Sequence, residues 1–271
     1  MKRVFCAVVI TVFMCINAYA QESDAGDGSR KPAGEGLLAD LGFEFSGDAA
    51  FNSIYMWRGI MLDGDPVVQP GFYVKTPESV FGRLKFGWWM SHDLKNRDAL
   101  KSSETDLIVD YTYNFPSFDV SVGHTYYDFP DALPADGATK GWSREFYAGF
   151  SLPKIFLSPS VFYYYDYGRK EDGGGQGNYT VLNLAYSMPM TIRKNQASLD
   201  FTAHLGHNNK LYYRGKGGDA ACGVGLALPL TRNLSCKPNV NYSVPWGNIS
   251  DKGNGNQKSR FYAGIYLSYT L

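Results

Sequence analysis

Two histidines, His204 and His207, have the residue type and the close spacing that a metal site or a proton-transfer site would use. Residues three apart in a β-strand point to opposite faces, so these two imidazoles cannot bind one ion together. Asp200 is the only nearby carboxylate with the same strand parity as His204. We therefore expect His204 to hydrogen-bond inside a polar interior, and we expect neither a metal nor another cofactor.

The serines and histidines do not have the spacing of a nucleophilic site. Ser198 and His204 share a strand face, but six residues of strand separate them by roughly 20 Å, far beyond hydrogen-bond reach. The glycine-rich run at residues 173–177 lacks the Lys and Ser/Thr that complete a phosphate-binding loop. The sequence thus predicts a protein that is not an enzyme.

Cys222 and Cys236 are the cysteines that remain after the N-terminal segment. An oxidising compartment would permit a disulfide between them. A hairpin that turns at residues 231–233 places Cys222 near Tyr242 and Cys236 near Leu228, so the two thiols are not opposite each other. Because a disulfide needs Cα atoms within about 7 Å, we favour free thiols, with the disulfide as the alternative.

The elements that carry these side chains are predicted to be strands, because apolar residues alternate with small or polar residues through segments of about ten. Two kinds of connection, one short and one long, alternate between the segments. The short kind contains proline and lies at residues 76–79, 115–117, 152–154, 188–190 and 228–233. The long, polar kind lies at residues 58–66, 92–103, 129–141, 168–178, 208–217 and 246–258.

This pattern predicts an all-β fold, a transmembrane antiparallel up-and-down β-barrel of about 12 strands over residues 40–271. The 20 Tyr, 17 Phe and 30 Gly agree, because a barrel needs aromatic girdles and small inward residues. A soluble sandwich or barrel would alternate too, but its outward set would be charged. Here the second set is mostly Gly, Ser, Thr, Asn and Tyr, which disfavours the soluble alternative.

The N-terminal segment differs from the rest. Residues 1–20 have a basic start, an apolar stretch and a small-residue site, which is typical of a cleaved secretory signal peptide. Met14 before Cys15 disfavours the lipoprotein alternative. Residues 21–39 are rich in Gly, Ser and charged residues, and they predict a flexible periplasmic N-terminal segment. Without the two basic residues of the signal, the formal charge falls from zero to −2, so nothing indicates nucleic-acid binding.

Residues 52–71, NSIYMWRGIMLDGDPVVQPG, connect the first predicted strand to the second. We expect the first strand to continue through Tyr55 and Trp57, with both rings at a membrane interface. Arg58 would then leave the strand and anchor the first loop to inward carboxylates, with contact to lipid headgroups as the alternative. We expect Gly59 to adopt a conformation that a Cβ would strain.

This run resembles the TorF-type porin family of Gram-negative bacteria, whose pattern is approximately S-x-Y-x-F-R-G-I-x-x-x-x-G-x-P-x-x-Q-G-G. The chain departs where its Ser is shifted by one position and where Pro70 replaces a Gly. Residues 126–130 and 145–149 keep the family's later order. The resemblance implies an outer-membrane barrel and no particular solute. The motif residues are Tyr55, Trp57, Arg58, Gly59, Gly64, Pro66, Gln69 and Gly71.

If the apolar set meets lipid, strand parity decides which charges line the lumen. A predicted basic wall consists of Lys75, Arg83, Lys85, Lys237 and Arg260. A predicted acidic wall consists of Glu44, Asp106, Asp110, Asp119, Glu145, Asp166, Asp200 and Asp219, with Glu44 as the one acid beside the basic residues. Opposed walls would set a transverse field across the lumen; the alternative is that the charges pair and brace the wall.

These observations predict an outer-membrane porin-like channel for passive diffusion of small hydrophilic solutes, with a non-conducting scaffold or adhesion platform as the alternative. The expected partners are outer-membrane lipid, small hydrophilic solutes and, during biogenesis, the barrel-assembly machinery. Residues 259–271 support the last of these, because their alternation resembles the C-terminal assembly signal of outer-membrane barrels, with Leu271 in place of the usual aromatic.

Overall fold

The structure is a computed structural model that describes residues 41–95, 103–130, 141–192 and 195–271. The predicted signal peptide (1–20) and N-terminal segment (21–39) lie outside the described residues. Contacts divide the chain into Met1–Phe43 and Glu44–Leu271, and the second unit contains every strand described below.

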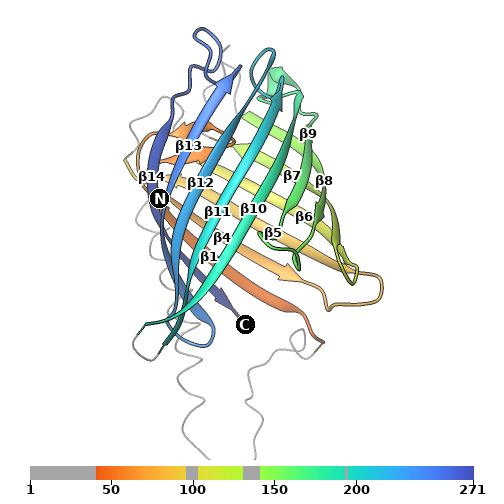
Figure 1. The fold of residues 1–271 in the computed structure, drawn as a ribbon. Coiled ribbons are helices and arrows are strands. Elements are labelled where there is room, and N and C mark those ends of the chain that lie inside the picture. Colours follow the sequence, from red (N-terminus) through yellow and green to blue (C-terminus); the bar gives the residue numbers. More distant parts are fainter. Residues whose placement is uncertain (1–40, 96–102, 131–140, 193–194) are drawn as a thin grey trace, which may run out of the picture. The chain divides into compact units, whose positions relative to one another are not determined.

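Within the described residues, twelve strands close into an antiparallel barrel in which each strand pairs with its neighbours in the chain (Figure 1). The barrel closes where β1 pairs with β14, with Ala49 opposite Leu267. This confirms the predicted fold class. The strands are β1 (Glu44–Asn52), β4 (Val67–Lys75), β5 (Arg83–Asp93), β6 (Glu104–Asn114), β7 (Asp119–Phe129), β8 (Gly141–Ser151), β9 (Ser160–Asp166), β10 (Gly177–Ile192), β11 (Asn195–Asn209), β12 (Lys216–Pro229), β13 (Leu234–Gly247) and β14 (Arg260–Thr270).

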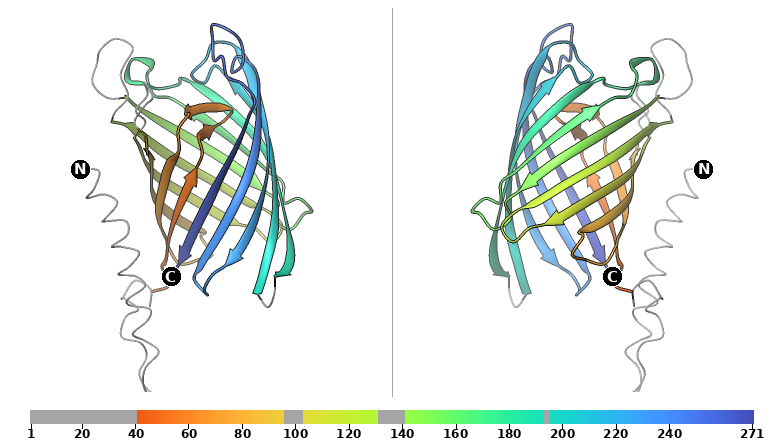
Figure 2. Two further views of the ribbon diagram at one scale, coloured as in Figure 1. Left: turned by 90° about the vertical axis from the view of Figure 1, so that its left-hand side faces the viewer. Right: turned by 90° about the vertical axis from the view of Figure 1, so that its right-hand side faces the viewer.

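Two short strands stay out of the wall. β2 (Tyr55–Trp57) and β3 (Ile60–Asp63) pair only with each other and form a hairpin, which we call the lumen hairpin. In the side views it folds into the barrel near one end (Figure 2). The expectation that the first wall strand continues through Tyr55 and Trp57 is therefore wrong. The wall strand ends at Asn52, and the Ser53 N–H then donates to the Ala263 carbonyl at 2.8 Å.

The two faces of the wall have opposite chemistry, as the period of two requires. Apolar side chains are exposed on the outside, among them Phe51, Phe86, Leu107, Val109, Val122, Phe146, Leu205, Val240, Phe261 and Ile265. Polar side chains are buried inside, among them Asp106, Asp110, Thr125, Ser143, Glu145, Asp166, Asp219 and Ser243. An apolar exterior around a polar interior is the arrangement of a barrel that spans a membrane. Within the described residues, no helix has the length and hydropathy of a membrane span.

The connections alternate between the two ends of the barrel. Residues 76–82, 115–118, 152–159 and 230–233 form connections at the end where the C-terminus lies, which we call the short-turn end (Figure 1). The Thr270 N–H donates to the Asn233 carbonyl there. The longer connections lie at the opposite, long-loop end, and one of them contains the 3₁₀ turn η2 (Lys170–Asp172). The predicted alternation between two ends is confirmed. The division by length has an exception, because the connection at residues 210–215 is shorter than the one at residues 152–159.

One predicted turn is wrong. Pro189 lies inside β10, opposite Ser198, whereas residues 188–190 were expected to turn. Strand β10 pairs with β9 only as far as Asn183, so its remaining residues have a strand on one side only. The Ala185 N–H points to the side of β9, where it donates to the Leu157 carbonyl, and Pro189 has the same parity as Ala185. A proline is tolerated there because its missing N–H faces no neighbouring strand.

Candidate functional site: the lumen hairpin and its cage

The lumen hairpin turns at two residues in the left-handed region of backbone space. Trp57 pairs with Ile60, and between them Arg58 has a φ of 49° and Gly59 a φ of 75°. Two successive positive φ values define the type I′ turn, which matches the twist of paired strands. A Cβ on Gly59 would come within 2.5 Å of the Asp219 Cβ, so glycine is required both by conformation and by space.

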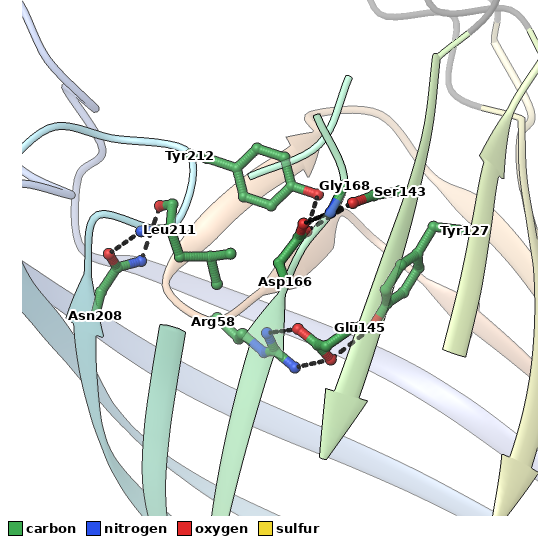
Figure 3. Close-up of polar contacts among 9 residues, drawn as sticks. All are labelled: Arg58, Tyr127, Ser143, Glu145, Asp166, Gly168, Asn208, Leu211 and Tyr212. Carbon is green, nitrogen blue, oxygen red and sulfur yellow. Dashed lines mark hydrogen bonds and ion pairs between the residues drawn. The ribbon is translucent and has the colours of Figure 1, made fainter. Parts of the chain in front are cut away.

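Arg58 extends from this turn to a carboxylate on the wall. Its two terminal nitrogens donate to the two oxygens of Glu145 at 2.6 and 2.8 Å, a bidentate pair (Figure 3). The Tyr127 hydroxyl donates to the same carboxylate at 3.0 Å. The Arg58 side chain is 10% exposed and that of Glu145 1%. The expected contact between Arg58 and an inward carboxylate is therefore present, and lipid headgroups are not its partner.

Aromatic rings surround the guanidinium. Its carbon lies 4.3 Å from the ring centre of Trp57, 4.1 Å from that of Tyr164 and 4.9 Å from that of Tyr179. We call these three rings together with Glu145 the guanidinium cage. Removing an arginine from water costs several kcal/mol, and only good geometry offsets that cost. The bidentate pair and the ring faces offset this desolvation cost, since a desolvated cation on an aromatic face gains about 2 kcal/mol.

The rest of the hairpin contacts the wall on several sides. The Tyr55 and Trp89 rings lie 5.8 Å apart, and Trp57 meets Tyr127 and Tyr212 edge to face. β9 and β10, which carry the cage tyrosines, lie halfway round the strand order from β1 and β4. The hairpin therefore crosses the lumen from one side to the other.

Tyr212 belongs to a long-loop connection that covers the hairpin. Its hydroxyl donates to Asp166 at 3.3 Å, and the same carboxylate accepts from Ser143 and from the Gly168 N–H (Figure 3). Burial raises the pKa of the Tyr212 hydroxyl well above its usual range. Asn208 holds the start of this connection through both its amide oxygen and its amide nitrogen to the backbone of the fully buried Leu211. The hairpin is thus enclosed from the long-loop end.

The predicted basic residues do not form a wall of their own. Lys75 and Arg83 both pair with Glu44, the second at 2.8 Å. Lys85 lies 4.0 Å from Asp110, and Lys237 lies 3.7 Å from Asp200. The expectation of two opposed, segregated walls is corrected by these pairs, which join strands that are adjacent or two apart in the barrel. Long basic side chains span this distance to an inward acid. The alternative, that the charges pair and brace the wall, describes these residues.

Other predicted lumen residues have different surroundings. Asp119 accepts from Asn114 at 2.8 Å beside a short turn, and the Arg260 Nε is buried without a hydrogen-bond partner among the described residues. Three inward acids on the described wall strands were missed, Asp48, Glu104 and Asp93, the last of which is buried on β5 with the parity of Lys85. Asp48 accepts from Tyr266 at 2.7 Å, and Glu104 is buried on the strand that also carries Asp106. Asp48 has the parity of Glu44, and Glu104 that of Asp106, so strand parity alone could have found these two. Asp93 was assigned to the connection at residues 92–103, whereas β5 extends to it.

His204 and His207 point to opposite faces, as their spacing predicts, since His204 faces the interior and His207 is exposed. The partner of His204 is Asp219, at 2.6 Å on the next strand, and not Asp200 on its own strand. Tyr179 also donates to Asp219, at 2.7 Å. In the described part of the chain, no three His, Cys, Asp or Glu side chains are grouped to hold a metal.

The register at the two cysteines is confirmed. Cys222 lies opposite Tyr242 and Cys236 opposite Leu228, and both thiols are free.

Towards the short-turn end, the lumen is hollow. One open cavity of about 350 Å³ is lined mainly by polar side chains, including Asp200, Thr202, Lys237 and Asn241. A second, of about 280 Å³, is lined by residues that include Asp48, Lys75 and Ser268. Both cavities share Tyr266, so they meet at this ring. The lumen therefore has two parts, a polar vestibule formed by these cavities and a part filled by the hairpin.

Several solved structures are similar in fold. The NanC porin has a TM-score of 0.47 at 11% identity over 84% of this chain and 100% of its own. The KdgM porin in complex with disordered oligogalacturonate has a TM-score of 0.46 at 11% identity, over 84% of this chain and 99% of its own. The COG4313 outer membrane channel from Pseudomonas putida F1 has a TM-score of 0.47 at 10% identity, over 92% of this chain and 99% of its own. At these identities the likeness concerns the fold alone.

No curated protein matches the sequence. The family model described as "Bacterial protein of unknown function (Gcw_chp)" matches residues 38–223, a region that runs from before β1 into β12 and includes the lumen hairpin, Glu145, Tyr164 and Tyr179. This match covers well over half of the chain, and the protein therefore belongs to the Gcw_chp family.

Proposed function

We propose that this protein is a porin-like channel of the Gram-negative outer membrane, through which small hydrophilic solutes diffuse passively, without a cofactor or a chemical step. In this proposal the resemblance to TorF-type porins reflects a shared role. The short-turn end would face the periplasm and the long-loop end the exterior, as in outer-membrane barrels generally. Lipid, the diffusing solutes and the barrel-assembly machinery would be its partners.

The observation that carries this proposal is the polar vestibule. Cavities of about 350 and 280 Å³ are lined by carboxylates, amides, hydroxyls and lysines that face one another across open space. A barrel that served only as a scaffold would gain stability by filling this space with packed side chains, since empty volume is destabilising. A hydrated, polar interior instead suits hydrophilic solutes.

The lumen hairpin is the barrier on this route. It crosses the lumen and is held by Arg58 in the guanidinium cage, so passage requires the hairpin to leave or to shift. The same hairpin is the observation that favours the alternative, a non-conducting barrel that serves as a scaffold or adhesion platform.

The register of the wall strands suggests an experiment that distinguishes a channel from a non-conducting scaffold. Asn52 and Val67 lie directly opposite each other at the ends of β1 and β4. Residues 53–66 can therefore be replaced by Asn-Gly, which makes a two-residue type I′ connection, while the wall pairing stays intact. Conductance in planar bilayers should be large and steady for this deletion variant and small or intermittent for the wild type.

Folding of the deletion variant would be checked by the change in gel mobility that folded barrels show on heating. Arg169→Ala is the matched control, because Arg169 is exposed and lies on a loop outside the lumen. A folded deletion variant that leaves the bilayer closed at all voltages would refute the channel and support the scaffold.

A further inference from the structure

We propose that Glu145, Tyr164 and Tyr179 form a recognition site for solutes that carry a guanidinium group, a site that Arg58 occupies while the hairpin closes the lumen. This inference rests on the proposed channel function, because a solute reaches these residues only through the lumen. It assigns a chemical class of solute to a pathway that is otherwise described only as hydrophilic.

The three residues belong to wall strands and not to the hairpin, and Tyr179 and Glu145 have hydrogen-bond partners on the wall as well. Tyr164 and Tyr179 lie opposite each other on β9 and β10, with ring centres 6.4 Å apart. Tyr179 is oriented by its hydrogen bond to Asp219, and Glu145 by that from Tyr127. Strand positions with fixed side-chain partners form a preorganised site, which loses little entropy on binding.

The chemistry selects a guanidinium over other small cations. Glu145 offers both oxygens in one plane, which matches the parallel N–H bonds of a guanidinium and not the single point charge of an ammonium. The faces of Tyr164 and Tyr179 lie within 4.1 and 4.9 Å of the guanidinium carbon, so they suit a flat, weakly hydrated ion. A neutral molecule of the same shape, such as urea, would leave the buried carboxylate uncompensated.

A second observation concerns the residue that fills the site now. Arg58 has a φ of 49°, a conformation that costs a non-glycine residue about 1–2 kcal/mol and that Asn adopts more readily. The first position of this turn would therefore favour Asn on backbone grounds. This chain has arginine there despite the backbone cost, and the gain that offsets the cost comes from the contacts of the guanidinium in the cage.

The test uses Arg58→Asn, which should keep the turn and empty the cage. Guanidinium chloride and methylguanidine at millimolar concentration would be titrated into the purified, folded barrel by calorimetry, with urea and ammonium chloride as controls. We expect saturable binding to the variant at least about tenfold tighter than to the wild type. Urea and ammonium should not bind, and Arg58→Asn combined with Glu145→Gln should lose the binding.

If Arg58→Asn misfolds, the deletion variant without residues 53–66 carries the same wall site and replaces it. Equal binding of urea, or unchanged binding after Glu145→Gln, would overturn the site. A deletion variant that conducts but binds no guanidinium would overturn this inference alone. Binding in a barrel that never conducts would overturn the channel and, with it, the assignment of a solute, leaving only a guanidinium pocket for Arg58.

Discussion

Gly59 at the tip of the lumen hairpin lies directly against Asp219 on β12, where a Cβ would come 2.5 Å from the aspartate Cβ. The tip of the hairpin therefore packs against β12 without room for a larger residue. Because Arg58 directly precedes Gly59, any substitution that moves this tip also moves the guanidinium in its cage.

Gly59→Ala should release the hairpin. It adds the cost of a left-handed alanine, about 1–2 kcal/mol, to a clash that only movement can relieve. Trypsin should then cut after Arg58 much faster than in the wild type, as measured by fragment analysis in detergent. Gly215→Ala is the matched control, since Gly215 has a φ of 81° but no atoms within 4 Å of its Cβ position. Equal cleavage in both variants would mean that the contact with Asp219 does not hold the tip.

Glu145→Gln should weaken the closed state more than any exposed charge substitution. It leaves the buried Arg58 without its counter-charge, a change that costs about 3–5 kcal/mol in buried pairs. We expect more frequent and longer openings in planar bilayers. Asp172→Asn removes an acid that pairs with Arg169 on an exposed loop, where a pair contributes about 0–1 kcal/mol, and it should leave the openings unchanged. A Glu145→Gln barrel that opens no more often than the wild type would contradict the role of the Arg58–Glu145 pair in holding the hairpin.

The deletion variant without the hairpin should prefer cations at low salt. Removing Arg58 leaves Glu145 without its basic partner, whereas Lys75, Arg83, Lys85 and Lys237 remain close to acids. A negative lumen concentrates cations, and the preference should fade as the Debye length falls from about 30 Å at 0.01 M salt to about 3 Å at 1 M. The reversal potential in a salt gradient measures it. Asp110→Asn with Glu145→Gln should reduce the preference, and an anion preference before substitution would refute this charge distribution.

Cys222 and Cys236 should remain reduced in the folded barrel. Their registers place them opposite Tyr242 and Leu228 on neighbouring strands, out of reach of each other. Gel mobility of the unfolded chain should be the same with and without reductant, and Cys222 and Cys236 should both react with a maleimide after unfolding. A mobility shift on reduction would show a register different from the one described.

The barrel wall was largely predictable because its structure depends on features that can be counted along the chain. Alternation gives the face of each residue, and the position of a turn gives the register, which is why the partners of Cys222 and Cys236 followed from the sequence. Strand parity also predicted that Glu145 faces the lumen, and Arg58 was predicted to contact an inward carboxylate. It could not say which one, because Arg58 and Glu145 are 87 residues apart and meet across the lumen.

The hairpin was missed because period two does not distinguish a wall strand from a strand inside the barrel. Tyr55 and Trp57 continue the alternation of β1, yet Tyr55 is buried in the lumen. Register follows from the sequence only where the turn is tight. The pair of Lys85 with Asp110 joins strands whose connection is long, and that of Lys237 with Asp200 spans two strands, so neither could be predicted.

The direct pairing of Asn52 with Val67 means that the barrier of this barrel is an insertion at a single point of an otherwise complete cylinder. Permeability and wall stability are therefore separable properties that substitutions can change independently. A designed peptide inserted between these two residues would be enclosed by the existing barrel wall, and the protein would become a nanopore with an exchangeable constriction.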